Sequence, residues 1–244
     1  MERGEYERLA AAEDRMWWFR GLHANLAGVF AEDAPTGRVL DAGCGTGGLM
    51  VRLAARLPDA AIIGLDLDRG AAAVARGKSG RPVCVGSVDR LPLAASSLDA
   101  ILSADVLCHK GVDQAAALLD FRRCLKPGGR LVLNLPAYRW LYSQHDAAVD
   151  NARRYARAEV AHLLAAAGFA RIRTRYWNTF LFPLMVLRRK LWSRGAGGAA
   201  SDVALLPAPV ERAFGAVMAL ESRLVGAGIP LPFGGSILAI AVKP

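Results

Sequence analysis

The segment 39–49 constrains the fold of this chain more than any other. A short apolar run ends in Asp41, and glycines then stand at positions 43, 45 and 47. Leucines four residues apart, at positions 49, 53 and 57, follow at once and indicate a helix. A strand, a glycine turn and a helix in this order put the turn where a nucleotide-like ligand meets a helix N-terminus. Glycine suits that turn because a Cβ would block the ligand and disfavour positive φ angles.

A second apolar run, 61–68, carries another carboxylate, Asp66. This residue follows the last glycine by about 20 positions, the spacing at which an acid meets the hydroxyls of a bound ribose. A dinucleotide site reads GxGxxG, whereas here Gly47 comes only two positions after Gly45, and Asp41 precedes the first glycine. Both differences favour S-adenosylmethionine over NAD, since S-adenosylmethionine has no pyrophosphate to bind.

With these residues in view, the chain resembles the class I S-adenosylmethionine-dependent methyltransferases. Segment 86–93 is similar to the part of that family that contacts adenine, 96–103 to its fourth strand, and 125–133 to its fifth strand with the preceding turn. A bacterial subset acting on small molecules or lipids also shares the Trp-Trp-Phe run at 17–19, a His-Asp pair at 145–146 and an Arg-Arg-Tyr triplet at 153–155. The resemblance covers most of the chain.

The resemblance implies S-adenosylmethionine as the cofactor and assigns its contacts. Relatives often place an acid directly after the glycine at position 86, whereas this chain has Ser87 there and Asp89 two residues later. We therefore expect backbone groups of Val88 to hold the adenine, with Asp89 a weaker candidate. The expected cofactor contacts are Asp41, Gly43, Gly45, Gly47, Asp66, Leu67, Ser87, Val88, Ser103, His109 and Trp18.

Alternating strand and helix patterns predict a Rossmann-like α/β fold with a doubly wound, mostly parallel sheet of seven strands. Strands are expected at 38–42, 61–66, 82–86, 98–104, 130–135, 170–176 and 236–242, and helices at 47–57, 69–77, 113–125, 157–167 and 207–225. The resemblance implies the order 3-2-1-4-5-7-6, with the seventh strand antiparallel.

The domain organisation is expected to be a single methyltransferase domain, 1–244, with two additions. About 60 residues separate the last two strands, far more than a hairpin loop needs. We expect 179–234 to form a helical lid inserted between those strands, and 1–35 to supply a cap helix over the cofactor. Three adjacent aromatics at 17–19 cannot all face one core from a single helix, so at least one should face a ligand or the lid.

Composition and cysteine usage indicate a cytoplasmic protein without a metal site. No apolar run reaches the roughly 18 residues of a membrane span, and segment 1–5 lacks the apolar stretch of a signal peptide. Cys44, Cys84, Cys108 and Cys124 are widely spaced and form no CxxC pair, so we expect reduced thiols.

The charge is distributed unevenly. Residues 1–150 are balanced, whereas residues 151–244 hold thirteen Lys and Arg against four Asp and Glu, which accounts for the whole net charge of +9. Basic charge confined to one segment indicates an anionic partner there. The apolar run 180–187, followed by Arg188, Arg189 and Lys190, suits a lipid-like anionic acceptor or peripheral contact with the inner membrane surface. A solvated basic face and a buried lid helix are the alternatives.

The candidate acceptor site is the polar loop after the fifth strand, at the carboxyl edge where ligands bind in such sheets. We expect His145 to be a general base or to orient the acceptor, with Arg154 and Tyr155 holding an anionic or polar group of the acceptor. The alternative is a polar network that fixes the loop. Among the other histidines, His109 and His23 are candidates to line the site, and His162 is expected to be structural or solvated. The Asn-Leu-Pro-Ala-Tyr run at 134–138 is interpreted as a strand exit.

The leading functional hypothesis is methyl transfer to a small-molecule or lipid-like acceptor, at oxygen in the first instance. An RNA or protein methyltransferase that uses the basic C-terminal segment is the second hypothesis. A non-catalytic S-adenosylmethionine-binding partner subunit is the third. No DNA partner is expected, and RNA stays open.

Overall fold

A computed structural model describes residue 10, residues 12–189 and residues 205–244. Lys190 and Trp192, which the sequence places in the basic part of the insertion, lie outside the described residues. Seven strands form one sheet in the order β3-β2-β1-β4-β5-β7-β6. The strands are β1 (Arg38–Ala42), β2 (Ala61–Asp66), β3 (Val83–Val85), β4 (Leu98–Ala104), β5 (Leu125–Pro136), β6 (Ala170–Trp177) and β7 (Ser236–Val242).

The sheet confirms the predicted Rossmann-like fold and strand order. β1 to β5 are parallel, and β7 pairs antiparallel with both β5 and β6. The fifth strand begins at Leu125 instead of residue 130, because Leu98 already pairs with Leu125 before a register shift in β4. The third strand is two residues shorter than expected.

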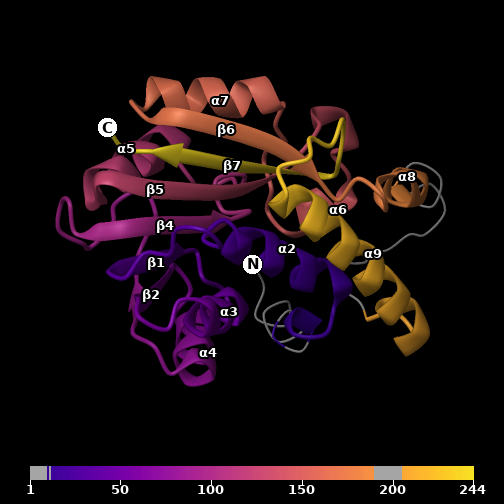
Figure 1. The fold of residues 1–244 in the computed structure, drawn as a ribbon, viewed down its shortest axis with the longest axis horizontal. Coiled ribbons are helices and arrows are strands. Elements are labelled where there is room, and N and C mark those ends of the chain that lie inside the picture. The colour runs from indigo at the N-terminus through magenta and orange to yellow at the C-terminus, as the bar shows by residue number, and fades with distance from the viewer. Residues whose placement is uncertain (1–9, 11, 190–204) are drawn as a thin grey trace.

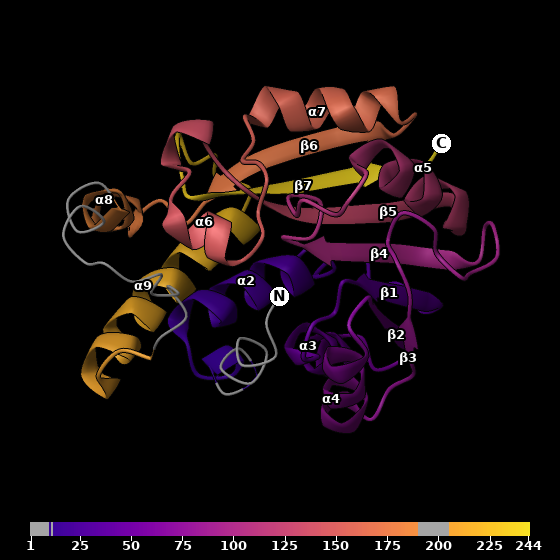
Figure 2. The same cartoon turned by 180° about the vertical axis from the view of Figure 1, so that it is seen from behind.

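Helices cover both faces of the sheet (Figures 1 and 2). They are α2 (Trp17–Gly28), α3 (Gly48–Arg56), α4 (Arg69–Ser79), α5 (Gln114–Cys124), α6 (Gln144–Ala148), α7 (Arg157–Ala166), α8 (Phe182–Leu187) and α9 (Ala208–Gly226), with a 3₁₀ turn η1 (Arg139–Leu141). Residues from α5 and α7 pack on one face, and residues from α2, α3, α4 and α9 pack on the other.

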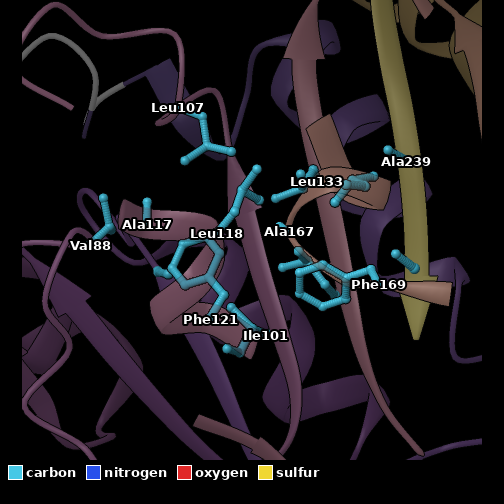
Figure 3. Packing of buried hydrophobic residues seen from close by; sticks show 14 of the residues in the cluster. Val88, Ile101, Leu107, Ala117, Leu118, Phe121, Leu133, Ala167, Phe169 and Ala239 are labelled. Atoms are coloured by element: carbon cyan, nitrogen blue, oxygen red, sulfur yellow. The ribbon is translucent and has the colours of Figure 1, made fainter. Parts of the chain in front are cut away.

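The central strands are apolar on both sides because both faces are covered. Along β4, Ile101 belongs to the core beneath α5 and α7, whereas its neighbour Leu102 belongs to the core beneath α2 and α3. Phe121 of α5 and Phe169 near the start of β6 fill the first of these cores (Figure 3). Such burial of apolar surface supplies most of the driving force for folding.

The insertion between β6 and β7 is helical, as predicted, and consists of α8 and α9 within the described residues. Figure 1 shows α9 lying alongside α2 and α8 standing beyond the end of the sheet. Trp17 of α2 meets Phe214 of α9 edge to face at 5.6 Å, and its backbone N–H donates to Glu211 Oε2 at 2.9 Å. The helix before β1 (α2) and the helix before β7 (α9) are therefore bound to each other.

Candidate functional site

A cavity of about 600 Å³ lies at the carboxyl ends of β1, β2 and β4. Its walls come from α2, the glycine turn, the turns after β2, β3 and β4, the region around α6, and the segment from the end of β6 through α8. In an open parallel sheet this is the edge at which ligands bind. Nine of the eleven expected cofactor contacts lie in this lining, and Gly47 and Ser103 do not.

The glycine turn has the backbone conformation that the sequence predicts. Gly43 has φ 83°, and a Cβ there would lie 2.2 Å from Val106 Cγ2. Gly45 has φ 52° and lines the cavity, and a Cβ built on it would meet no atom of the protein within 4 Å. The space in front of Gly45 is therefore open to a ligand. Gly47 instead packs against the backbone of Ala75 in α4, so its role is in the scaffold.

Two carboxylates flank this open space. Asp66 Oδ2 accepts from Gly45 N at 2.8 Å and Asp66 Oδ1 accepts from Asp68 N at 2.9 Å, so Asp66 fixes the turn. Burial raises the pKa of Asp66, and these two backbone donors oppose the rise. Asp41 is buried, and its Oδ2 has no hydrogen-bond partner within the part of the chain described. Burial raises the pKa of Asp41 well above its usual range, and the charges of Glu13 and Asp66 raise it further.

These carboxylates fit a cationic nucleoside ligand. A buried carboxyl with an unpartnered oxygen is costly unless a donor reaches it. The ammonium and sulfonium groups of S-adenosylmethionine would supply positive charge and donors there, while Asp66 would retain lone pairs for ribose hydroxyls.

Glu13 is a site residue that the sequence analysis missed. Its carboxylate accepts from Thr46 Oγ1 at 2.6 Å, from Gly48 N at 3.0 Å and from Lys78 Nζ at 2.9 Å. The N-terminus of α3 is thus occupied by an anion of the protein itself, at the position where a dinucleotide would place its pyrophosphate. Glu13 stands 35 residues before Gly48 and belongs to no local motif.

The aromatic run of α2 covers the cavity. Trp17, Trp18 and Phe19 all line it, and Trp18 stacks on Trp177 of β6 with ring centroids 6.2 Å apart. Together with the Trp17 contacts to α9, this stacking holds α2 across the site. That α2 caps a bound cofactor stays a prediction.

The segment after β3 holds the residues that are expected to contact adenine. Ser87 and Val88 line the cavity, and Ser87 Oγ accepts from Asp89 N at 3.2 Å. Asp89 does not line the cavity. Leu67 lines it with 73% of its surface exposed, so its side chain is accessible to a ligand. Ser103 Oγ donates to Ala42 O at 2.9 Å and joins β4 to β1, away from the cavity.

The polar loop after β5 reaches the cavity through His145, Asp146 and Arg154. Asp146 Oδ1 accepts from Arg154 Nε at 2.9 Å, and Asp146 Oδ2 accepts from Arg189 Nη1 at 3.3 Å. Burial alone would raise the pKa of Asp146, but the hydrogen bond and charge of Arg154, together with the charge of Arg189, lower it overall. One carboxylate faces two guanidinium groups here, so the trio keeps a net positive charge.

Tyr155, expected at the acceptor, is not brought to the cavity. It is 1% exposed, and its hydroxyl donates to Leu107 O at 2.8 Å and lies 2.9 Å from Gln114 Oε1. The structure therefore does not support the predicted contact between Tyr155 and an acceptor. The Tyr155 hydroxyl, its one polar side-chain group, makes its hydrogen bonds inside the core. Arg154 also donates to Ala137 O at 3.0 Å, which fits a positioning role through Asp146.

The other histidines differ in placement. His109 lines the cavity, and burial lowers its pKa. His23 also lines the cavity, where burial and the charges of Arg52 and Lys78 lower its pKa to about 3. His162 is exposed on α7, outside the cavity lining, as expected for a solvated residue.

Two further polar residues that no local motif predicts also line the cavity. Asp105 follows β4 directly, and Asn178 follows β6. Both have left-handed backbones, with φ 54° and 59°. The signal that could have found them is their place at strand ends on the ligand-binding edge.

Comparisons with known proteins agree on one family. A profile described as "Methyltransferase domain" matches residues 40–133. Malonyl-[acyl-carrier protein] O-methyltransferase of Geobacter sulfurreducens is 32% identical over 182 residues, which are 68% of this chain and 66% of that protein. The enzyme of the same name from Dechloromonas aromatica is 38% identical over 54% of this chain and 48% of its own length.

A third relative is the ubiquinone/menaquinone biosynthesis C-methyltransferase UbiE of Syntrophotalea carbinolica, 38% identical over 41% of this chain and 44% of that protein. The chain thus spans between 44% and 66% of the length of these three curated relatives.

Solved structures show the same fold. An S-adenosylmethionine-dependent methyltransferase of Thermotoga maritima superposes with a TM-score of 0.62 at 22% identity, covering 99% of this chain and 95% of that one. A geranyl diphosphate methyltransferase in complex with S-adenosylmethionine gives 0.61 at 18% identity, covering 100% and 92%. The glycine turn, the acid at the end of β2, the strand order and these relatives lead to one conclusion: the chain belongs to the class I S-adenosylmethionine-dependent methyltransferases.

Proposed function

We propose that this protein transfers the methyl group of S-adenosylmethionine to an oxygen of a small or lipid-like acceptor that carries an anionic group. The observation that carries the proposal is the charge pattern of the cavity. Glu13, Asp41 and Asp66 line it beside the glycine turn, and Arg154, Arg188 and Arg189 line it beside α6 and α8. In Figure 2, α3, which follows the glycine turn, lies on one side of α2, and α6 and α8 lie on the other.

The carboxylates beside the glycine turn suit the cationic donor, and the arginines beside α6 and α8 suit an anionic acceptor. A cationic donor is stabilised by nearby carboxylates, and an anionic group is stabilised by guanidinium groups. Between them the walls are apolar, with Trp18, Leu181 and Leu184 among the lining residues. Such walls favour an acceptor with a hydrocarbon part and exclude water from the reacting atoms.

The reaction mainly requires the protein to position the two reactants. S-adenosylmethionine supplies an activated methyl group, so the protein must align an oxygen in line with it. His145 would orient the acceptor, Arg188 would hold the anionic group, and Arg154 would position the loop through Asp146. The malonyl-[acyl-carrier protein] O-methyltransferases and the geranyl diphosphate methyltransferase are named for acceptors with anionic groups, which supports this assignment.

Transfer of labelled methyl from S-adenosylmethionine into an extract of the source cells tests the proposal. The extract is afterwards separated into lipid, aqueous small-molecule, RNA and protein fractions. We expect label in the lipid or small-molecule fraction. Label in RNA or protein would contradict the proposal and favour recognition of a polymer by residues 151–244, and no label in any fraction would favour a non-catalytic binding subunit.

Peripheral contact with an anionic membrane is a second proposal, carried by α8. All six residues of this helix are apolar, and none of them is buried. Phe180, Leu184 and Leu187 are each between 44% and 49% exposed on or beside it. Within the described residues, no helix is long and apolar enough to cross a membrane. Surface insertion of such a segment would bring a lipid-like acceptor to the cavity.

Co-flotation with vesicles of phosphatidylglycerol and phosphatidylcholine tests this second proposal. Leu184→Glu should reduce flotation strongly, because a charge would have to enter the acyl boundary, whereas Leu220→Glu on the exposed side of α9 serves as the matched control. Equal flotation of both variants and the wild type would contradict it.

A further inference from the structure

We infer that Asp105 receives the proton of the acceptor during methyl transfer, and that the acceptor oxygen is accordingly a hydroxyl and not a carboxylate. The inference rests on the proposed function and specifies the class of acceptor and the destination of the proton.

Asp105 stands beside the place where the donor would bind. It directly follows Ala104, the last residue of β4, and lines the cavity. The next residue, Val106, packs so closely over Gly43 that a Cβ there would lie 2.2 Å from Val106 Cγ2. Asp105 is therefore one residue away from a direct contact with the glycine turn. Its φ of 54° is uncommon for a residue other than glycine and is maintained only where the surroundings fix it.

A buried relay of hydrogen bonds fixes the Asp105 carboxyl. Trp177 Nε1 donates to Asn134 Oδ1 at 2.7 Å, and Asn134 Nδ2 donates to Asp105 Oδ2 at 2.9 Å. An indole N–H can only donate, so the Asn134 oxygen must face Trp177 and its NH₂ group must face Asp105. Asn134 and Trp177 are both fully buried. The backbone also contributes, since Asp105 N donates to Asn134 O at 2.9 Å.

This relay orients the carboxyl for proton transfer. The Asn134 amide donates to Asp105 Oδ2, so Asp105 Oδ1 takes no part in the relay. Asp105 itself lines the cavity. The side chain is held from β5 and β6, strands that belong to the rigid sheet. A base fixed in this way loses little entropy when an acceptor docks against it.

The electrostatic surroundings suit a base that works near neutral pH. Burial raises the pKa of Asp105 to about 7, opposed by the Asn134 amide and the charge of Arg154, and the charge of Asp146 adds to the rise. The other titratable groups facing it are the Cys108 thiol and the Tyr155 hydroxyl, whose pKa values burial raises, so both are neutral. A base with a pKa close to the operating pH is the most effective one.

The step balances without any further reagent. The acceptor oxygen forms a bond to the methyl carbon while the carbon–sulfur bond breaks, and the electron pair of that bond stays on sulfur. The hydroxyl proton passes to the Asp105 carboxylate, which later releases it to solvent. A carboxylate acceptor is already ionised and has no such proton, so it would not need Asp105.

The experiment compares Asp105→Asn with the wild type, using labelled S-adenosylmethionine and whichever lipid or small-molecule fraction the wild type labels. Asparagine can still accept from Asn134, so the fold and the affinity for S-adenosylmethionine should stay within about twofold of the wild type. Turnover at pH 7 should fall about 100-fold, which is within the usual contribution of a general base. The wild-type rate should rise with pH through about 7, and this rise should be absent from the variant.

Two further variants separate proton transfer from structural effects. Asp113→Asn changes the exposed N-cap carboxylate of α5 and should behave like the wild type, since asparagine also caps helices. Asn134→Leu removes the amide that holds the Asp105 pKa down, so the rising part of the pH profile should move to higher pH.

Two results would overturn the inference. One is wild-type turnover and an unchanged pH profile in Asp105→Asn, and the other is a methylated product that dilute alkali cleaves as a carboxylic methyl ester. If the wild type labels neither fraction, the proposed function is refuted first, and the inference falls with it.

Discussion

The Glu13 carboxylate caps the first turn of α3 by accepting the backbone N–H of Gly48, 35 residues further along the chain. The same carboxylate receives the Thr46 hydroxyl and the Lys78 ammonium group. The segment before β1 thereby fixes the glycine turn from outside the motif that defines it.

Glu13→Ala should weaken both the fold and donor binding. Loss of the cap and of the Thr46 partner should lower the free energy of unfolding by about 2 kcal/mol, measured by urea denaturation. Affinity for S-adenosylmethionine, measured by calorimetry, should fall because the turn is no longer held. Glu13→Gln keeps an accepting oxygen and should show a smaller loss. Wild-type affinity in Glu13→Ala would disprove a role in shaping the site.

Asp66→Ala should reduce the affinity for S-adenosylmethionine by tenfold or more, which corresponds to about 1.4 kcal/mol. The change removes the acceptor for Gly45 N and the expected acceptor for the ribose hydroxyls. Asp68→Ala is the matched control, because Asp68 caps α4 through Ala71 N and lies outside the cavity lining. Equal affinities of the two variants would rule out the ribose assignment.

His145→Ala should leave the affinity for S-adenosylmethionine intact and lower turnover. His145 lines the cavity and belongs to α6, which lies apart from α3 and the glycine turn before it (Figure 2), so its loss should affect the acceptor only. His162→Ala, on the exposed side of α7, is the control. Wild-type turnover with the labelled fraction would remove His145 from the mechanism.

Tyr155→Phe should lower stability and spare catalysis. The phenol group bonds to Leu107 O and lies beside Gln114 within the core, and deleting it should cost about 1 to 2 kcal/mol of unfolding free energy. Turnover per folded molecule should be unchanged. A fall in turnover at unaltered stability would instead place Tyr155 at the acceptor, as the sequence alone suggested.

The contribution of Asp105 to stability should be lost as the pH rises from about 4 to about 7. The Asp105 pKa is raised to about 7 in the folded state from its ordinary value of 3.8, so in this window the folded state binds more protons than the unfolded state. The contribution is fully present below pH 4 and is lost through pH 7, by up to about 4 kcal/mol. Asp105→Asn should flatten this slope in denaturation curves taken at several pH values. An identical slope in both proteins would show that Asp105 titrates normally.

The sequence predicts well what local patterns determine. Strands β1, β2, β4 and β7 have the expected bounds because their apolar runs end at clear turns, and the positive φ angles of Gly43 and Gly45 follow from the motif. Asp41 and Asp66 line the cavity because each ends or nearly ends a strand at the same edge of the sheet.

Residues whose roles depend on distant contacts could not be predicted in this way. Glu13 acts on Gly48 and Lys78, and Asp105 is held by Asn134, which the sequence suggested only as a strand exit. Tyr155 shows the reverse case: its polar neighbours in the chain suggested an active-edge role, but its side chain turns into the core. Sequence proximity does not determine which side of a loop faces a ligand.

The contact between α2 and α9 joins segments that are almost 200 residues apart, through Trp17, Phe214 and Glu211. Both helices contribute to the cavity lining, so neither can open alone without breaking the pairing with the other. The two helices should therefore behave as one cooperative unit in amide hydrogen exchange. Donor binding should then slow exchange in both helices to the same extent.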